Sequence, residues 1–330
     1  MSITTQNPNT KPKIIIAGGT GFIGKYLSDY FLKKGFEVVV FSRGKSKPPV
    51  CPARPAGGRI GRENQTRYVN WDGKNLSDWK TELEGSFLLI NLSGKTVAVR
   101  HNPKNKKEIF GSRIDSTKVL NQAVLLCENP PKYWVNSSGA TIYKTSFSES
   151  RDEYFTETEP EFLTDVILAW EDEFFKNPNP KTKKLALRTS VVFGKKGDTF
   201  EKLNLLSKLG LGGKQGNGKQ IMSWIHIEDF ARIIEFSVEK NIEGFINMAS
   251  PNPVANSEMM RAFRKANNIP FGIPTPEFLL KIGTKIIGVE PDFVLKSYNV
   301  VSKRLEENGF EFKFPTIDKA LGDLIHSHDS

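Results

Sequence analysis

A glycine-rich turn near the start of the sequence has the residue types and spacing of a phosphate-binding loop. Gly18, Gly21 and Gly24 stand three residues apart. Such a turn needs positive φ, and the missing Cβ atoms let the backbone approach a pyrophosphate. The N-terminus of a following helix offers free N–H groups and its positive dipole end. A plain strand-to-helix turn is the alternative, but the context favours a dinucleotide site formed by Gly18, Gly19, Thr20, Gly21, Phe22, Ile23 and Gly24.

The end of the second expected strand indicates which dinucleotide is bound. An acidic residue there would bind the ribose 2′-OH of NAD, whereas an arginine suits the 2′-phosphate of NADP. This chain has Ser42 and Arg43, then Lys45 and Lys47, with no acidic residue close by. Because a guanidinium matches a phosphate as a two-pronged donor, we predict NADP(H), with NAD as the weaker candidate.

The elements that must position these residues alternate between short apolar runs and helical patterns. The turn lies between such a run and a segment whose apolar residues recur with a helical period until Gly35. The expected strands are 13–17, 37–42, 66–70, 87–92, 133–137, 184–189, 223–227 and 245–248. The longest expected helix is 104–128, and another is expected to open at Asp229. Strand–helix alternation predicts an α/β fold of the Rossmann type, a doubly wound parallel sheet that binds NAD(P).

Two stretches depart from this alternation. Residues 43–65 are rich in Pro, Gly and Arg without periodicity, so we expect a long, poorly ordered loop. After residue 194 glycines crowd 210–218, and from 251 onward helical patterns and prolines dominate. We therefore expect a cofactor domain of 12–198 with 223–250, and a smaller, mainly helical domain of 199–222 with 251–325. A substrate cleft is expected between them.

The motifs together resemble one family over nearly the whole chain, from about residue 13 to 321. The chain resembles an atypical short-chain dehydrogenase/reductase of the extended kind and is similar to the epimerase family proteins with a C-terminal helical domain. Besides the glycine turn, the motifs are Trp71-Asp72, Asn91-Leu92-Ser93-Gly94, Gly111-Ser112-Arg113, Trp170-Glu171, and Ser223-Trp224-Ile225-His226 followed by Asp229.

The resemblance implies where further residues meet the cofactor. Leu92 and Ser93, with Gly94 after them, would run beside the adenosine and pyrophosphate, and Asp72 would face the adenine. Glu108 and Arg113 would border the pocket, although an ordinary surface ion pair is an equal alternative. Val192 would line the nicotinamide end. Ligands of open α/β sheets bind at the carboxyl ends of the strands, which indicates the same location.

The catalytic signature of that superfamily is missing. Its members usually carry a Ser or Thr, and a Tyr whose pKa is lowered by a Lys four residues later. The only Tyr with a Lys at that spacing is Tyr30, followed by Lys34, and this pair stands in the helix directly after the glycine turn and not where the family motif aligns. Alignment on the family motifs places Gly139, Leu163 and Ile167 at the three positions. Ser138 and Tyr143 are the substitutes that we expect to carry any acid/base chemistry.

Two functions therefore stay open. One is an NADP(H)-dependent oxidoreductase or epimerase with non-standard catalytic residues, acting on an unknown small molecule. The other is a protein that binds or senses NADP(H) without turnover. The intact glycine turn is common to both, and the missing triad favours the second.

Composition excludes several other classes. The net charge is +10 over 330 residues, but no aromatic residues are interleaved with the lysine clusters, so no nucleic acid is expected. No apolar run approaches the ~20 residues of a membrane span, and no membrane partner is expected. Cys51 and Cys127 lie far apart, which favours a reducing cytoplasm. The four histidines are scattered, so no metal site is expected. Monomer and homodimer both stay open.

Overall fold

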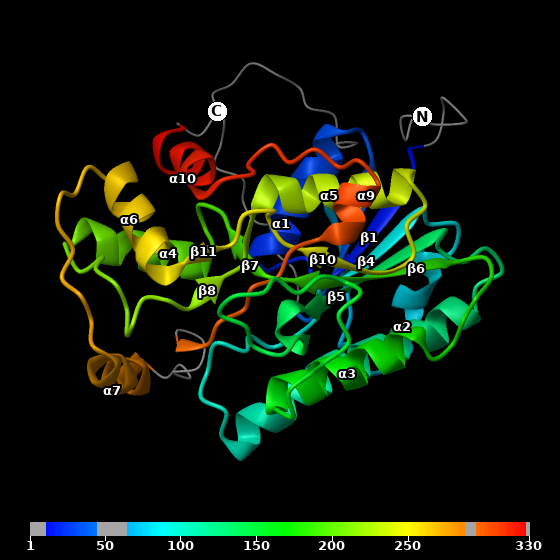
Figure 1. Cartoon of the computed structure of the whole chain (residues 1–330). Helices are drawn as coiled ribbons and strands as arrows, with labels where there is room; N and C mark the ends of the chain where they lie inside the picture. The colour runs from blue at the N-terminus through cyan, green and yellow to red at the C-terminus, as the bar shows by residue number, and fades with distance from the viewer. Residues whose placement is uncertain (1–10, 45–64, 288–294, 328–330) are drawn as a thin grey trace.

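A computed structural model describes residues 11–44, 65–287 and 295–327. Most of the loop expected at 43–65 lies outside these residues, as do Lys45, Lys47 and Cys51. Figure 1 shows a central sheet with helices on both sides, and a mainly helical part at one end of the molecule.

The central sheet has seven strands in the order β10-β6-β5-β4-β1-β2-β3, and every neighbouring pair is parallel. This confirms the predicted Rossmann-type α/β fold. The strands are β1 (Lys13–Ala17), β2 (Glu37–Ser42), β3 (Arg67–Asn70), β4 (Leu88–Asn91), β5 (Tyr133–Gly139), β6 (Lys183–Thr189) and β10 (Gly244–Met248). The inner strands are apolar because helices cover both of their faces.

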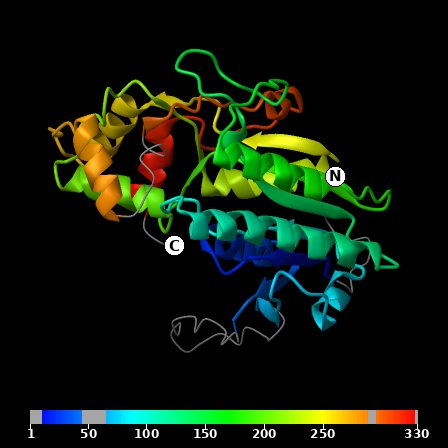
Figure 2. The same ribbon diagram turned by 90° about the horizontal axis from the view of Figure 1, so that it is seen from below.

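Two core clusters fill the two sides of the sheet. One joins the sheet to α1 (Phe22–Lys33) and α5 (Ile227–Glu239) through residues such as Phe31 and Phe230. The other joins it to α2 (Pro103–Leu125) and α3 (Phe162–Phe175) through Leu120 and Phe174. Figure 1 shows α2 and α3 beneath the sheet, and Figure 2, seen from below, shows them side by side. Two short 3₁₀ helices, Asp78–Leu83 and Ala140–Ile142, complete the connections.

The helical part at the end of the molecule has its own core cluster. Phe200, Trp224 and Phe263 are buried there with residues of the C-terminal helix. Its helices are α4 (Asp198–Lys208), α6 (Asn256–Ala266), α7 (Glu277–Ile287) and α10 (Ile317–His326). It also contains two small sheets of two strands each. In one, β7 (Val191–Phe193) pairs with β9 (Trp224–His226), and in the other β8 (Ile221–Met222) pairs with β11 (Val254–Ala255). Between α7 and α10 the chain returns to the sheet. Leu305 of α9 (Lys303–Glu307) and Phe310 pack there in the core between the sheet, α1 and α5.

One helix begins earlier than the sequence suggested. Asp229 was the expected opening residue of α5, but the helix starts at Ile227 and the ring of His226 accepts a hydrogen bond from the Glu228 N–H at 3.2 Å. The Asp229 carboxylate instead accepts the backbone N–H groups of Lys313 and Phe314. In the described parts of the chain, no helix combines the length and apolar character that crossing a membrane requires.

His226 makes folding stability depend on pH. Burial lowers the pKa of its ring below the ordinary value, while the Asp323 carboxylate, 3.3 Å from Nε2, acts in the opposite direction. On acidification the unfolded chain therefore takes up a proton that the folded chain resists, so stability falls as pH decreases. We expect the free energy of unfolding, measured in urea, to drop between about pH 7.5 and 5.5.

His226→Asn keeps a side-chain acceptor for the Glu228 N–H but does not titrate in this range. This variant should be less stable, because it loses the contact with Phe314, yet its stability should change less with pH. An unchanged pH dependence would contradict the assignment to His226.

Candidate functional site

The glycine turn joins β1 to α1 through contacts that only glycines permit. Gly18 has φ +76°, and a Cβ added to it would lie 2.9 Å from the backbone carbon of Leu92. A Cβ on Gly24 would lie 2.4 Å from the Cα of Gly19, so α1 is seated directly on the turn. Around Gly21 the nearest atom to an added Cβ is the Gly18 carbonyl oxygen at 3.9 Å. Gly21 therefore leaves open space that a ligand can approach.

The N-terminus of α1 is free to bind an anion. Its N-cap, Gly21, makes no side-chain capping bond, and the first turn carries no acidic residue. The first N–H groups and the positive end of the helix dipole therefore have no negative group of their own to satisfy them. A phosphate is the natural partner for such an end.

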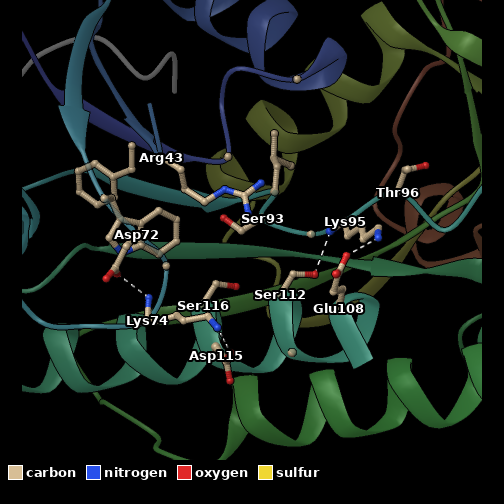
Figure 3. Close-up of a pocket in the computed structure, with 18 of the residues that line it drawn as sticks. Arg43, Asp72, Lys74, Ser93, Lys95, Thr96, Glu108, Ser112, Asp115 and Ser116 are labelled. Atoms are coloured by element: carbon tan, nitrogen blue, oxygen red, sulfur yellow. Dashed lines mark hydrogen bonds and ion pairs between the residues drawn. The ribbon is translucent and has the colours of Figure 1, made fainter. Parts of the chain in front are cut away.

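A cavity of about 1200 Å³ lies in front of this turn. It opens at the carboxyl ends of β1, β2, β3 and β4, as the rule for open sheets requires. Figure 3 shows the Arg43 guanidinium directed toward Ser93, with Asp72 and Lys74 on one side and Lys95 and Glu108 on the other. Ten of the predicted cofactor residues line it: Gly18, Thr20, Gly21, Ser42, Arg43, Asp72, Leu92, Ser93, Gly94 and Glu108.

The charges around this first cavity favour an anionic ligand. Its acidic residues are already engaged: Glu108 pairs with Lys95, Asp115 lies 3.5 Å from the Lys74 ammonium, and Asp72 accepts N–H bonds from Lys74 and Asn75. These hydrogen bonds hold the pKa of Asp72 below its usual value, and the bond from the Asn75 backbone N–H has the largest effect. Arg43 has no ion pair with any described residue. Sequence reasoning missed the basic lining residues Lys74, Lys95, Lys104 and Lys107, although each follows a strand or opens a helix at this edge.

Ser93 has a buried hydroxyl that lacks a partner among the described residues. Its backbone N–H donates to Asn91 Oδ1 at 3.0 Å, which fixes the loop after β4. Ser93 lines both the first cavity and a second one that continues from it. An unsatisfied buried hydroxyl at this junction calls for an external hydrogen-bond acceptor or donor. Together with the open turn and the free helix end, it fits a dinucleotide that runs from the first cavity into the second.

The second cavity has a volume of about 410 Å³ and largely apolar walls. Besides the shared loop residues, its apolar side chains are Ile23, Val97, Ala140, Leu163, Val166, Ile167, Trp170, Val191, Ile221, Met222 and Tyr298. Val191 takes the place that we expected for Val192, which pairs with Ile225 and packs against the sheet core. Val192 is thus the neighbour of a lining residue, and its expected place at the nicotinamide end stays a prediction.

Arg113 lines the second cavity rather than the first. One of its amino groups donates to the carbonyl oxygens of Lys95 and Ile109, both at 3.0 Å, and the guanidinium lies 5.1 Å from the Trp170 ring centre. Burial lowers the pKa of Arg113 to about 10, and no carboxylate in the described parts of the chain pairs with it. A partly buried cation of this kind attracts an anionic group of a ligand.

Apolar residues occupy the position of the usual catalytic triad. A Cβ on Gly139 would lie 2.8 Å from the Ile167 terminal carbon, so this side chain fills the space of a hydroxyl residue. Leu163 lines the same wall. The missing Cβ of Gly139 and the bulk of Ile167 are thus complementary parts of one apolar surface.

Of the two expected substitutes, only Ser138 reaches the second cavity. Its hydroxyl donates to Glu171 Oε1 at 2.6 Å, and Glu171 forms a two-pronged ion pair with Arg188. Tyr143 lines neither cavity: its buried phenol donates to Asn247 Oδ1 at 2.8 Å and accepts a hydrogen bond from Arg188. Burial also raises the pKa of Tyr143. The Tyr143 phenol therefore lies outside both cavities, and this geometry gives no support to its expected catalytic role.

The remaining residues of the glycine turn serve the packing of α1. Gly19 faces Val40, and Gly24 touches Gly19. The Phe22 ring covers Gly194, where an added Cβ would lie 2.6 Å from it. Ile23 alone of these extends into the second cavity. Among residues 11–44, 65–287 and 295–327, no group of three His, Cys, Asp or Glu side chains could hold a metal ion.

The contrast between Gly18 and Gly21 can be tested directly. Gly18→Ala should lower the free energy of unfolding by roughly 2 kcal/mol, because positive φ and the Leu92 backbone oppose a Cβ. Gly21→Ala should leave the melting temperature nearly unchanged but weaken NADPH binding about ten-fold, since its Cβ would enter the ligand's space. Melting curves and NADPH titrations measure both. Loss of stability in Gly21→Ala, or full NADPH affinity in it, would contradict this geometry.

Comparison with known proteins agrees with the fold. The chain is 29% identical over 318 residues to the mouse epimerase family protein SDR39U1, covering 95% of this chain and 99% of the relative. It is 30% identical to the chloroplastic homologue of Arabidopsis thaliana, covering 97% and 89%. The crystal structure of human SDR39U1 with NADPH superposes with a TM-score of 0.81 at 27% identity, covering 96% of this chain and all of that one.

Two segments match described families. Residues 275–324 match a domain of unknown function, DUF1731, within the C-terminal helical part. Residues 14–249 match the NAD dependent epimerase/dehydratase family, which confirms the resemblance drawn from the motifs. The chain belongs to the NAD dependent epimerase/dehydratase family.

Proposed function

We propose that this protein is an NADP(H)-dependent oxidoreductase or epimerase-like enzyme that works without the usual Tyr–Lys pair. The observation that carries the proposal is the continuous pair of cavities. A basic one lies in front of a free helix end, and an apolar one follows it across the unsatisfied Ser93 hydroxyl. The human relative was crystallised with NADPH, which supports the choice of cofactor.

The residues that would hold the cofactor lie along the first cavity. Gly18, Thr20 and Gly21, with the first N–H groups of α1, would bind the pyrophosphate. Arg43 would bind the 2′-phosphate, since it projects into the cavity and pairs with no described acid. When bound, the nicotinamide supplies hydride chemistry in the second cavity, at the border of which Arg113, Ile23 and Ser93 lie.

The chain's own contribution in the second cavity is positioning and exclusion of water. The apolar wall that includes Ile167 and Leu163 would pack against a small substrate and keep solvent out. Ser138 would accept a hydrogen bond from the substrate, because its own proton is held by Glu171. Leu163 and Ile167 themselves have no proton to donate in place of the usual tyrosine and lysine.

A second candidate function is binding or sensing of NADP(H) without turnover, and it rests on the same apolar wall.

We also propose a cytoplasmic location, a monomeric or homodimeric state, and a division into two domains, 12–198 with 223–250 and 199–222 with 251–325. One relative is described as chloroplastic, so location is a property to be measured for this chain.

Titration with NADPH and NADH tests the cofactor assignment. NADPH should bind at least about ten-fold more tightly, and Arg43→Ala should remove most of this difference because a charge-assisted phosphate contact is lost. Lys33→Ala, which removes an exposed charge from the opposite end of α1, is the matched control. Equal affinities of the unmodified protein for the two cofactors would contradict the assignment to Arg43.

Fluorescence of bound NADPH during addition of carbonyl compounds separates the two functions. An enzyme should oxidise NADPH steadily with at least one compound, and Ser138→Ala should then lower kcat by about ten-fold. Tyr143→Phe should leave kcat nearly unchanged, because this phenol lines neither cavity. Failure to oxidise NADPH across a broad carbonyl panel, with NADPH still bound, would favour the sensing function.

A further inference from the structure

The second cavity is lined by positive side chains and, among the described residues, by no acidic one. Its cations are Lys95, Arg113 and Lys296. Lys95 pairs with Glu108, and Lys296 pairs with Glu161. Arg113 has no ion pair with a described residue. The cavity therefore holds one positive charge that no described acid balances.

The guanidinium of Arg113 is held in one place by backbone and ring contacts. Its Nη1 donates to the carbonyl oxygens of Lys95 and Ile109, both at 3.0 Å. Its Cζ lies 5.1 Å from the Trp170 ring centre. A Cβ added to Gly94 would come within 3.1 Å of the same Cζ, so the missing side chain leaves room for the guanidinium. Figure 2 shows α2 and α3, which carry Arg113 and Trp170, side by side.

The remaining donors of Arg113 form a free edge. Nε and Nη2 lie on one side of the guanidinium, and neither has an acceptor among the described residues. Two parallel N–H donors match the two oxygens of a carboxylate. Burial lowers the pKa of Arg113 to about 10, so the side chain stays charged at neutral pH. A single unbalanced charge favours a carboxylate over a phosphate monoester, which carries nearly two negative charges.

An apolar strip of α3 begins beside this charge. Leu163, Ile167 and Trp170 line the second cavity and follow one another at helical spacing, so they lie on one face of α3. From Leu163 to Trp170 the helix rises about 10 Å. Ile221 and Met222 of β8 add further apolar surface to the cavity. The lining is therefore complementary to a molecule with a charged end at Trp170 and an apolar body of about this length.

The position of Arg113 separates a substrate from the cofactor as the source of the anion. Gly18, Thr20 and Gly21, where the pyrophosphate is expected, line only the first cavity, whereas Arg113 lines only the second. The nicotinamide ring carries a carboxamide and no negative charge. The proposed function locates the substrate in the second cavity. On that basis we propose that this substrate is a carboxylic acid with an apolar body, and that Nε and Nη2 of Arg113 bind its carboxylate.

Calorimetric titration with acids and their amides tests the proposal on the full chain. The probes are 4-phenylbutyrate and heptanoate, each with the amide of the same shape, added to the protein with and without saturating NADPH. Each acid should bind at least about ten-fold more tightly than its amide, because only the carboxylate forms charge-assisted hydrogen bonds with Arg113. Equal affinities for acid and amide, or no binding of either acid, would overturn the proposal.

Arg113→Met removes the charge but keeps much of the length of the side chain. It should lower the affinity for the acids by about ten-fold or more and remove the preference over the amides, while NADPH still binds. Arg113→Lys keeps the charge without the two-pronged edge and should retain part of the preference. Arg261→Met is the matched control, because Arg261 is exposed, pairs with Glu258 and lines neither cavity.

Two further results would count against Arg113 as the carboxylate-binding residue. One is full affinity of Arg113→Met for the acids. The other is an equal loss of NADPH, acid and amide binding in a variant whose melting temperature is unchanged, since Arg113 would then serve the cofactor.

Binding of the acids is measured without turnover, so its result is separate from that of the enzyme assay. A preference for acids in a protein that oxidises no NADPH would support the carboxylate site and count against the enzyme. Oxidation of NADPH by neutral carbonyl compounds, with equal affinities for acid and amide, would support the enzyme and overturn the carboxylate site.

Discussion

The seating of α1 on the end of β1 is the contact on which the proposed site depends. Gly24 touches Gly19 so closely that a single methyl group would push the helix away. Gly18, at φ +76°, touches the backbone of Leu92 and Ser93, which ties the turn to the loop after β4. These two contacts bring a free helix end and the Ser93 hydroxyl to the same edge of the sheet. The glycines thus act first through packing, and the phosphate site is a consequence of that packing.

A buried polar network holds the other side of the same site. The side-chain amide of Asn91 donates to Asn136 and Thr117, and its Oδ1 accepts a hydrogen bond from the Ser93 N–H. Trp170 donates to Thr117 at 2.8 Å, and the face of its ring lies under Arg113. Buried amides are costly unless they are paired, so a network that is satisfied in one arrangement specifies that arrangement. The loop that joins both cavities is therefore fixed largely by Asn91, Thr117 and Asn136, which line neither cavity.

Local signals made the sheet and the glycine turn predictable, whereas contacts between distant segments decided what the sequence missed. The apolar run of β1 and the stop at Gly35 needed no tertiary knowledge, and the observed bounds of β1 agree with the prediction. Asp229 was misread because its partners, Lys313 and Phe314, are more than eighty residues away. Val191 lines the second cavity where Val192 was expected, and the pairing of β7 with β9 sets which of the two faces it. Tyr143 was expected to carry acid/base chemistry because of its phenol. The phenol is buried and hydrogen-bonded to Asn247 of β10, a contact that residues near Tyr143 in the sequence do not indicate.

The ion pair beneath the second cavity limits the chemistry that this chain can supply. Arg188 donates to Glu171, and Glu171 accepts the hydrogen bond of the Ser138 hydroxyl, so Ser138 presents only its oxygen lone pairs to the cavity. Breaking a buried pair by removing one partner costs about 3–5 kcal/mol, so this orientation is firmly set. Leu163 and Ile167 in the wall have no proton to donate. If the second cavity holds a reaction, its proton donor would therefore be water or a polar group elsewhere in the lining, such as Thr141, Lys296 or Tyr298, and not a residue at the usual tyrosine and lysine positions.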